Sequence, residues 1–228
     1  MEFARGMKTR PVKPRHAASL ILTRRVGDDV LVLMGRRPAR AVFPEAYVFP
    51  GGRLDLTDSR IAPSAPLSEK TLQDLCERGG CTPTLAHGLA TTAIRETYEE
   101  TGLLLAAQGH PGSAEGTWAE FANLGLAPAL NELSFLGRAI TPASAPVRFH
   151  ARFFMADGER LTGTMKSNGE LLALDWYPLR VAREFPAIDV TKFVLAELES
   201  MSAGQQREAP FFRYRRNKPV RQTSNEAG

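Results

Sequence analysis

The sequence predicts an α/β domain in which strands alternate with helices. Three stretches support this class. Residues 30–34 are apolar throughout, as expected of a strand that is covered on both faces. Residues 83–101 follow a threonine, open on a proline and stop before a glycine, which are the usual signals of a helix start and end. Residues 190–201 have the apolar spacing of an amphipathic helix.

The composition is that of a globular protein. Of the 228 residues, 43% are hydrophobic and 24% are charged, so a folded core is expected. No apolar run approaches the ~20 residues that span a membrane, and the first residues lack the apolar stretch of a secretory signal. We therefore expect a cytoplasmic protein without membrane contact. Cys76 and Cys81 are too few for a disulfide framework or a four-ligand zinc site and are expected to be reduced.

The net charge of +4 is unevenly distributed along the chain. Basic residues concentrate in residues 1–15, expected to be a flexible segment, and in residues 205–228, expected to be a tail. A single domain is predicted between them, over residues 16–204. Basic ends can attract nucleic acid, but the body shows no basic, aromatic-rich surface pattern, so nucleic acid is not expected as a partner. The sequence leaves a homodimer open.

The domain is expected to begin with a strand over residues 17–23, which a turn at residues 26–29 joins to the apolar strand described above. A loop over residues 41–50, with two prolines, then leads to Gly51 and Gly52. Glycine permits positive φ and a close approach of the backbone to a ligand. A glycine pair by itself is usually a plain turn, so its meaning depends on what lies opposite.

A short amphipathic helix is predicted next, with Ser68 as its cap and with Leu72, Leu75 and Cys76 on one face. The later part of the domain is expected to contain a short helix over residues 116–124 and strands over residues 133–141, 147–155 and 171–176. The strand over 171–176 is expected to be the final one, and the helix over residues 190–201 follows it. The strand over 147–155 alternates, with Arg148 and Arg152 on one face.

Three carboxylates share one face near the end of the predicted helix over residues 83–101. Glu96, Glu99 and Glu100 stand at i, i+3 and i+4, and Arg95 lies one turn before Glu99. Like charges so placed repel each other, and the negative end of the helix dipole disfavours them further. A divalent cation removes this penalty, and hard oxygen ligands favour magnesium, manganese or calcium over zinc. The alternatives are a solvated acidic face and a calcium-stabilised structural helix.

The run Arg95-Glu96-x-x-Glu99-Glu100-x-Gly102-Leu103 resembles the second half of the Nudix box, the signature of the Nudix hydrolases. Gly51-Gly52 and Asp58 resemble the first half, although the family usually has Glu where Asp58 stands. A much longer gap than usual separates the halves, so an insertion over about residues 58–82 splits the motif. A similarly split box occurs in the branch of the type 19 coenzyme A diphosphatases, which this chain resembles.

The resemblance implies a fold, an activity and a cofactor. The fold would be a mixed β-sheet sandwiched between α-helices, with a helical insertion within the box. The activity would be Mg²⁺- or Mn²⁺-dependent hydrolysis of the pyrophosphate bond in a nucleoside diphosphate linked to another moiety. Coenzyme A or an acyl derivative is the first expected substrate, and ADP-ribose, NADH and dinucleoside polyphosphates stay open. The rival is a non-catalytic nucleotide-sensing module on the same fold.

The resemblance also assigns roles to residues. Glu99 and Glu100 are expected to be the main metal ligands, together with a backbone carbonyl of Gly51, and Glu96 is expected to be a further ligand or the water-orienting base. Arg95 is expected to orient a carboxylate. Glu170, on a loop before a Trp-bearing strand, is a further catalytic carboxylate or an ordinary loop residue. The predicted substrate-binding residues are Arg36, Arg37, Gly52, Arg148 and Arg152. For the four arginines the alternative is a surface role.

Overall fold

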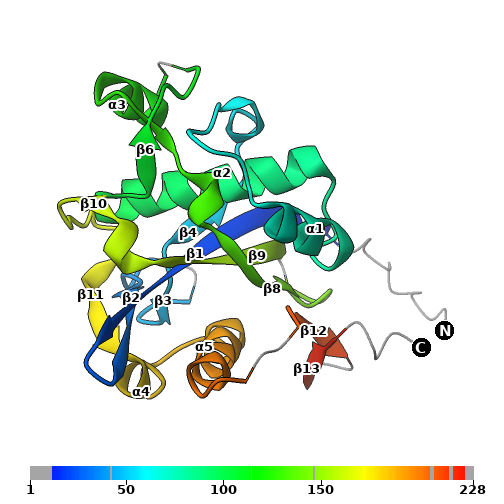
Figure 1. Cartoon of the computed structure of the whole chain (residues 1–228). Helices are drawn as coiled ribbons and strands as arrows, with labels where there is room; N and C mark the ends of the chain where they lie inside the picture. Colours follow the sequence, from blue (N-terminus) through cyan, green and yellow to red (C-terminus); the bar gives the residue numbers. More distant parts are fainter. Residues whose placement is uncertain are drawn as a thin grey trace, which may run out of the picture.

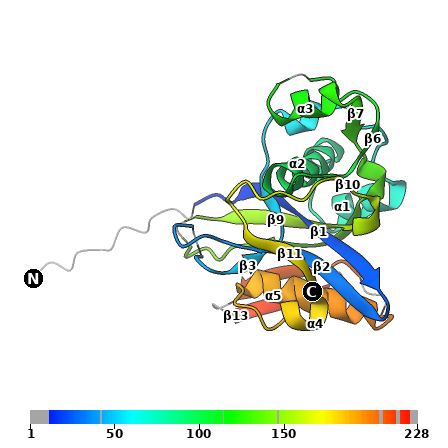
Figure 2. The same ribbon diagram turned by 90° about the vertical axis from the view of Figure 1, so that its left-hand side faces the viewer.

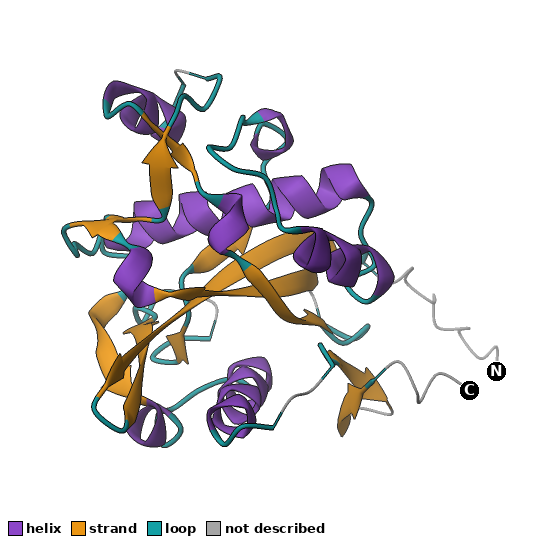
Figure 3. Cartoon of the chain, in the orientation of Figure 1, coloured by secondary structure: helices purple, strands orange, loops and turns teal. Residues whose placement is uncertain are grey.

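The computed structural model describes residues 12–41, 43–113, 115–145, 147–205, 208–215 and 218–223. They form a nine-stranded mixed sheet with helices on both faces (Figure 1, Figure 3). The predicted fold class, a mixed sheet between helical layers, is therefore confirmed. Within the described part of the chain, no helix is long and apolar enough to cross a bilayer.

The main sheet runs in the order β11-β2-β1-β9-β8-β12-β13, with β3 paired to β2 and β4 paired to β1. Its strands are β1 (Arg15–Val26), β2 (Asp29–Arg36), β3 (Tyr47–Val48), β4 (Gly51–Arg53), β8 (Ser134–Ile140), β9 (Phe149–Asp157), β11 (Leu172–Pro178), β12 (Phe211–Arg215) and β13 (Lys218–Gln222). The pairs β1–β9 and β8–β12 are parallel, and the others are antiparallel. Two small sheets pair β5 (Leu103–Leu104) with β10 (Thr162–Gly163) and β6 (Ala106–Gln108) with β7 (Leu126–Pro128).

Two helical layers enclose the sheet (Figure 2). The helices are α1 (Glu69–Glu77), α2 (Pro83–Thr101), α3 (Thr117–Asn123), α4 (Leu179–Ala182) and α5 (Asp189–Ser202), with short 3₁₀ turns η1 (Asp58–Arg60), η2 (Leu130–Glu132) and η3 (Gly158–Arg160). One core joins α1, α2 and α3 to the sheet through Leu75, Ile94 and Phe121. The other joins α4 and α5 to the opposite face, where Leu179 and Leu195 are buried. Each face of the sheet therefore packs against an apolar core.

Helix α2 has the bounds that the sequence predicts. The Thr82 hydroxyl accepts a hydrogen bond from the Leu85 N–H at 3.3 Å, and Pro83 occupies the first turn, where no intrahelical donor is needed. The helix ends at Gly102, whose φ of 70° lies in the left-handed region that glycine adopts without strain. Leu89 and Ile94 are fully buried against the sheet, so α2 is a rigid support for the groups at its end.

The alternation of β9 is confirmed, but the expectation that Arg152 lies on an open, basic face is wrong. Arg152 is fully buried beneath the end of α1. Its Nε donates to the Gly79 carbonyl at 3.0 Å, and its Nη2 donates to the Gly80 carbonyl at 3.3 Å. The helical layer that covers this face turns a surface-like pattern into an internal one. Arg152 therefore fixes the segment after α1 to the sheet.

The expected basic tail is a second departure from the sequence prediction. Residues 211–215 and 218–222 pair as the antiparallel strands β12 and β13, and β12 extends the main sheet by pairing with β8. Phe212 is buried, and the Arg221 guanidinium is ion-paired with Glu197 of α5. The strand over residues 172–178 is thus not the last one. The expected flexible segment falls mostly on residues outside the described part of the chain, although Arg15 already belongs to β1.

Candidate functional site

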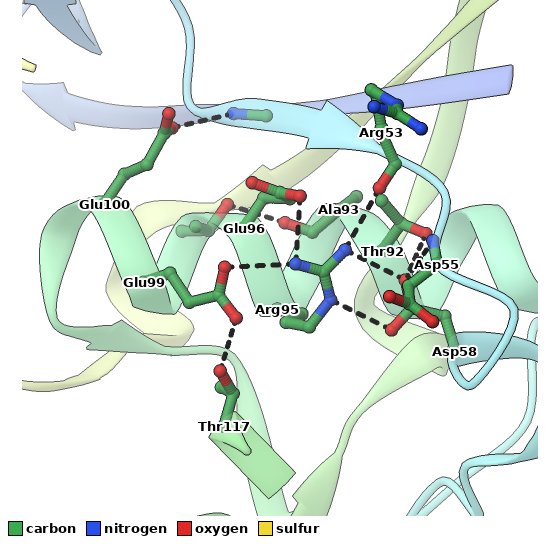
Figure 4. Close-up of polar contacts among 12 residues, drawn as sticks. Arg53, Asp55, Asp58, Thr92, Ala93, Arg95, Glu96, Glu99, Glu100 and Thr117 are labelled. Atoms are coloured by element: carbon green, nitrogen blue, oxygen red, sulfur yellow. Dashed lines mark hydrogen bonds and ion pairs between the residues drawn. The ribbon is translucent and has the colours of Figure 1, made fainter. Parts of the chain in front are cut away.

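The acidic turns of α2 lie against the glycine pair of β4. The Gly51 N–H donates to Glu100 Oε2 at 2.9 Å, and Glu100 is 7% exposed (Figure 4). A Cβ on Gly52 would lie 2.3 Å from Glu96 Cδ, so only glycine leaves room for that carboxylate. Residues 49 positions apart in the sequence therefore meet at the glycine bend. The carboxylates of Glu96 and Glu100 point toward the protein rather than into bulk solvent.

Arg95 connects the two halves of the split motif. Its Nε donates to Asp58 Oδ1 at 3.0 Å and its Nη2 donates to Asp58 Oδ2 at 3.0 Å (Figure 4). Its Nη1 lies 2.9 Å from Glu96 Oε1 and donates to Glu99 Oε2 at 3.0 Å. Nη2 also donates to the Arg53 carbonyl at 3.1 Å. The guanidinium thus fixes the glycine strand, η1 and two carboxylates of α2 relative to one another.

Asp58 is fully buried, and its carboxylate oxygens accept hydrogen bonds from the groups around it. Besides Arg95, the Thr92 hydroxyl donates to its Oδ2 at 2.7 Å and the Asp55 N–H donates at 3.2 Å. The hydrogen bond between Asp58 and Arg95 also affects the pKa of Arg95. Burial lowers the pKa of Arg95, but the hydrogen bond to Asp58 and the charges of Asp58, Glu96 and Glu99 outweigh burial, and the net shift is upward. Arg95 is therefore a permanent cation in the site.

Glu99 is held at both carboxylate oxygens. Oε2 accepts from Arg95, and Oε1 accepts from the hydroxyl of Thr117 in α3 (Figure 4). Its side chain is 35% exposed, more than that of Glu96 at 16%. The side of Glu99 toward α3 borders a pocket of about 290 Å³, which is lined by Asp55, Thr57, Arg95, Glu99 and residues 115–118.

Burial raises the pKa of two of the carboxylates. The pKa of Glu96 rises chiefly by burial, against the lowering effect of Arg95, and the charge of Glu99 adds to the rise. The pKa of Glu100 rises to about 8, chiefly by burial; the Gly51 hydrogen bond and Arg37 oppose this rise, while Glu96 and Glu170 add to it. Buried like charges are costly unless a cation neutralises them. These carboxylates are therefore held in a position that favours a positively charged ligand.

The donor set fits a hard divalent cation. The three glutamates present only carboxylate oxygens, which suit Mg²⁺ or Mn²⁺ better than soft metals. The glycine at position 52 leaves room for the Glu96 carboxylate beside the backbone, where a Cβ would overlap it. Within the residues that the structure describes, no three acidic, histidine or cysteine side chains surround a common point. The three glutamates therefore match a divalent cation in the chemistry of their oxygen donors and in the position of Glu96 and Glu100 beside the glycine bend.

The other predicted residues divide into two groups. Arg37 and Glu170 lie close enough to Glu100 to influence its pKa, so both border the site. Arg36 is ion-paired with Glu45, and Arg148 donates from Nε to the Thr141 carbonyl at 3.2 Å. A second Arg148 nitrogen donates to the carbonyl of Val12 at 2.8 Å. The structure therefore gives Arg148, like the buried Arg152, a backbone-anchoring position rather than one beside the glutamates.

The contact of Thr117 with Glu99 was not predicted from the sequence, and the role of Asp58 in the site was left open. Thr117 lies 18 positions after Glu99 on a helix outside the motif, and one threonine there carries no recognisable signal. The signal that could have placed Asp58 in the site is its position, as an acidic residue that follows the glycine pair. A larger pocket, of about 360 Å³, lies near Arg24, Met155 and Met201 and contains none of the predicted site residues.

The fold is similar to that of solved Nudix hydrolases. A Nudix hydrolase from Alicyclobacillus acidocaldarius shares 29% sequence identity at a TM-score of 0.65, over 87% of this chain and 99% of that one. The Nudix domain of Shewanella oneidensis NrtR, in complex with ADP ribose, shares 11% at 0.49, over 83% and 89%. A MutT protein from Bacillus halodurans shares 15% at 0.48, over 93% and 99%. No family model and no curated protein match the chain.

The likeness to the Alicyclobacillus protein carries the comparison, because the other two are too remote to support an argument. It extends over most of both chains. The comparison supports the Nudix superfamily and a hydrolase of the Nudix type.

Proposed function

We propose that this hydrolase cleaves the pyrophosphate bond of a nucleoside diphosphate linked to another moiety, with Mg²⁺ or Mn²⁺ as cofactor. The observation that carries the proposal is the placement of Glu96 and Glu100 against the Gly51–Gly52 bend. Carboxylates that are buried together, with raised pKa values, are stabilised by a divalent cation. A cation held there would face a diphosphate that binds along the Gly51–Gly52 bend.

The residues proposed to hold the metal are Glu96, Glu99 and Glu100, with a backbone carbonyl of Gly51. When bound, the metal supplies a nucleophilic water and neutralises charge on the phosphoryl oxygens. The protein's own contribution is orientation: Arg95 holds the carboxylates of Glu96 and Glu99 through Nη1. Such support restricts the side chains before the substrate arrives.

The substrate side of the proposal rests on Arg37, Gly52 and Glu170. Arg37 is proposed to contact a phosphate, because its charge already acts on Glu100. Gly52 allows the diphosphate to approach the backbone, and Glu170 is proposed as a base or further ligand. Arg36 can take part only if it leaves its ion pair with Glu45. Coenzyme A or an acyl derivative is the first proposed substrate.

The test is a panel of diphosphates with Mg²⁺ or Mn²⁺, with the products identified by mass. Coenzyme A, ADP-ribose, NADH and a dinucleoside polyphosphate are each expected to give a nucleoside monophosphate if cleaved, and the fastest defines the substrate. Glu99→Gln and Glu100→Gln are expected to lower the rate by several orders of magnitude with the fold intact. Glu77→Gln, an exposed carboxylate on α1, is the matched control. Near-normal turnover by both site variants would contradict the assignment.

The rival function has its own outcome in the same panel. A nucleotide-sensing module would show no turnover on any diphosphate and would bind nucleotide tightly without metal. The wild-type protein is therefore also titrated with each nucleotide in EDTA. Tight binding under those conditions, together with absent hydrolysis, would replace the proposed activity by the sensing function.

A further inference from the structure

Glu99 is restrained differently from the other two glutamates of α2. Glu96 and Glu100 lie against the glycine bend, whereas Glu99 is partly exposed and its two oxygens are held by Arg95 and Thr117. The Arg95 bond, at 3.0 Å, fixes one oxygen. The Thr117 bond fixes the other and comes from α3, an element outside the split motif.

The pocket beside Glu99 gives its side chain room to move. This space of about 290 Å³ is bordered by Glu99 itself and by Asp55, Glu115 and Thr117. A side chain next to such a space is confined by its hydrogen bonds rather than by packing. If the Thr117 bond were lost, the Glu99 carboxylate could rotate about the remaining bond to Arg95.

Thr117 itself is held in a fixed position by the packing of α3 on α2. Trp118 and Phe121 are buried, and the Phe121 ring meets the Tyr98 ring edge-on at 5.3 Å. The Tyr98 hydroxyl also donates to Glu120 of α3. The hydroxyl of Thr117 is therefore presented to Glu99 by a well-anchored segment.

We propose that Thr117 is a positioning residue that orients Glu99 for divalent-cation binding. The inference rests on the proposed function and deepens it, because it extends the metal site to a helix that the motif does not include. Binding a cation to an already oriented carboxylate avoids the entropy of ordering a free side chain. Removing the hydroxyl should therefore weaken cation binding while leaving the fold in place.

The experiment compares Mn²⁺ affinity, without substrate, in the wild type and three variants of the full chain, from the electron paramagnetic resonance signal of free Mn²⁺. Thr117→Val removes the hydroxyl at nearly constant shape. No side chain caps α3, so no capping bond is lost. The Kd of Thr117→Val for Mn²⁺ is expected to rise about threefold to tenfold. Thr117→Ser keeps the hydroxyl and should stay near wild type. Tyr98→Phe removes the other α2–α3 hydrogen bond and should also stay near wild type.

Activity gives a second readout. With the best substrate of the panel, Thr117→Val should need more Mn²⁺ for half-maximal rate and reach a near-normal kcat at saturating Mn²⁺. An unchanged or lower Kd in Thr117→Val, or an equal loss in Tyr98→Phe, would overturn the role of Thr117. If the wild type neither binds Mn²⁺ nor hydrolyses any diphosphate, the proposed function fails as well. If the wild type does both and Thr117→Val binds Mn²⁺ as tightly as the wild type, the positioning role alone fails.

Discussion

Replacing Asp58 by asparagine tests whether the buried ion pair with Arg95 holds the two halves of the site together. Asp58 is 0% exposed and receives two guanidinium bonds at 3.0 Å. Asparagine keeps the shape but removes the charge and places an amide N–H₂ where an acceptor is needed. Breaking a buried pair costs about 3–5 kcal/mol, and Arg95 retains Glu96 and Glu99. We therefore expect the lower end, about 3 kcal/mol.

The free energy of unfolding is measured by reversible urea denaturation followed by tryptophan fluorescence. For a domain of this size, a loss of about 3 kcal/mol corresponds to a fall in Tm of roughly 6–12 °C. Asp55→Asn is the matched control: it is the same chemical change three residues earlier, at an exposed side chain, and should stay within about 0.5 kcal/mol. A loss below about 1 kcal/mol in Asp58→Asn would refute the view that this pair is a main structural link.

Three further predictions follow from the same geometry. Gly52→Ala should displace the flexible carboxylate of Glu96, so hydrolysis should fall at least about tenfold while urea denaturation shows little change; unchanged kinetics would contradict this. Arg152→Met should leave the carbonyl of Gly79 without its donor and lower the free energy of unfolding by about 2 kcal/mol or more, with KM unchanged; a KM effect alone would restore a substrate role. Burial, Arg152 and Arg138 lower the pKa of His150 from 6.5 to about 3, so the unfolded chain binds the proton and stability falls as pH drops below 6.5. His150→Gln should flatten that slope in denaturation curves taken between pH 7 and about 4; an unchanged slope would exclude His150 as the cause.

Local signals were sufficient for much of the fold. The caps of α1 and α2 are short-range features, and the structure has Ser68 and Thr82 in both cap positions. The shared face of the three glutamates near the end of α2 could likewise be predicted, because their spacing lies within one helix. These elements depend on residues a few positions apart, where sequence patterns carry most of their information.

Features that depend on long-range packing could not be predicted in the same way. The alternation of β9 identified the two faces correctly but could not show that a helical layer covers Arg152. The strands β12 and β13 were not predicted, because their arginines are typical of a solvated basic tail, although Phe212 is buried. Thr117 reaches Glu99 only because α3 folds back onto α2. Each case depends on a partner that is distant in the sequence.

The ion pair between Asp58 and Arg95 has a consequence for how the chain can vary. It closes the intervening 37-position stretch into a loop whose two ends are fixed by charge rather than by adjacency. For a flexible loop, each doubling of length costs only about 0.6 kcal/mol of closure entropy. Lengthening this stretch at an exposed point, away from Leu75 and the carbonyls that Arg152 binds, should therefore leave Asp58 and Arg95 paired. An insertion between the two halves of the motif therefore costs little free energy, because the ion pair holds its two ends together.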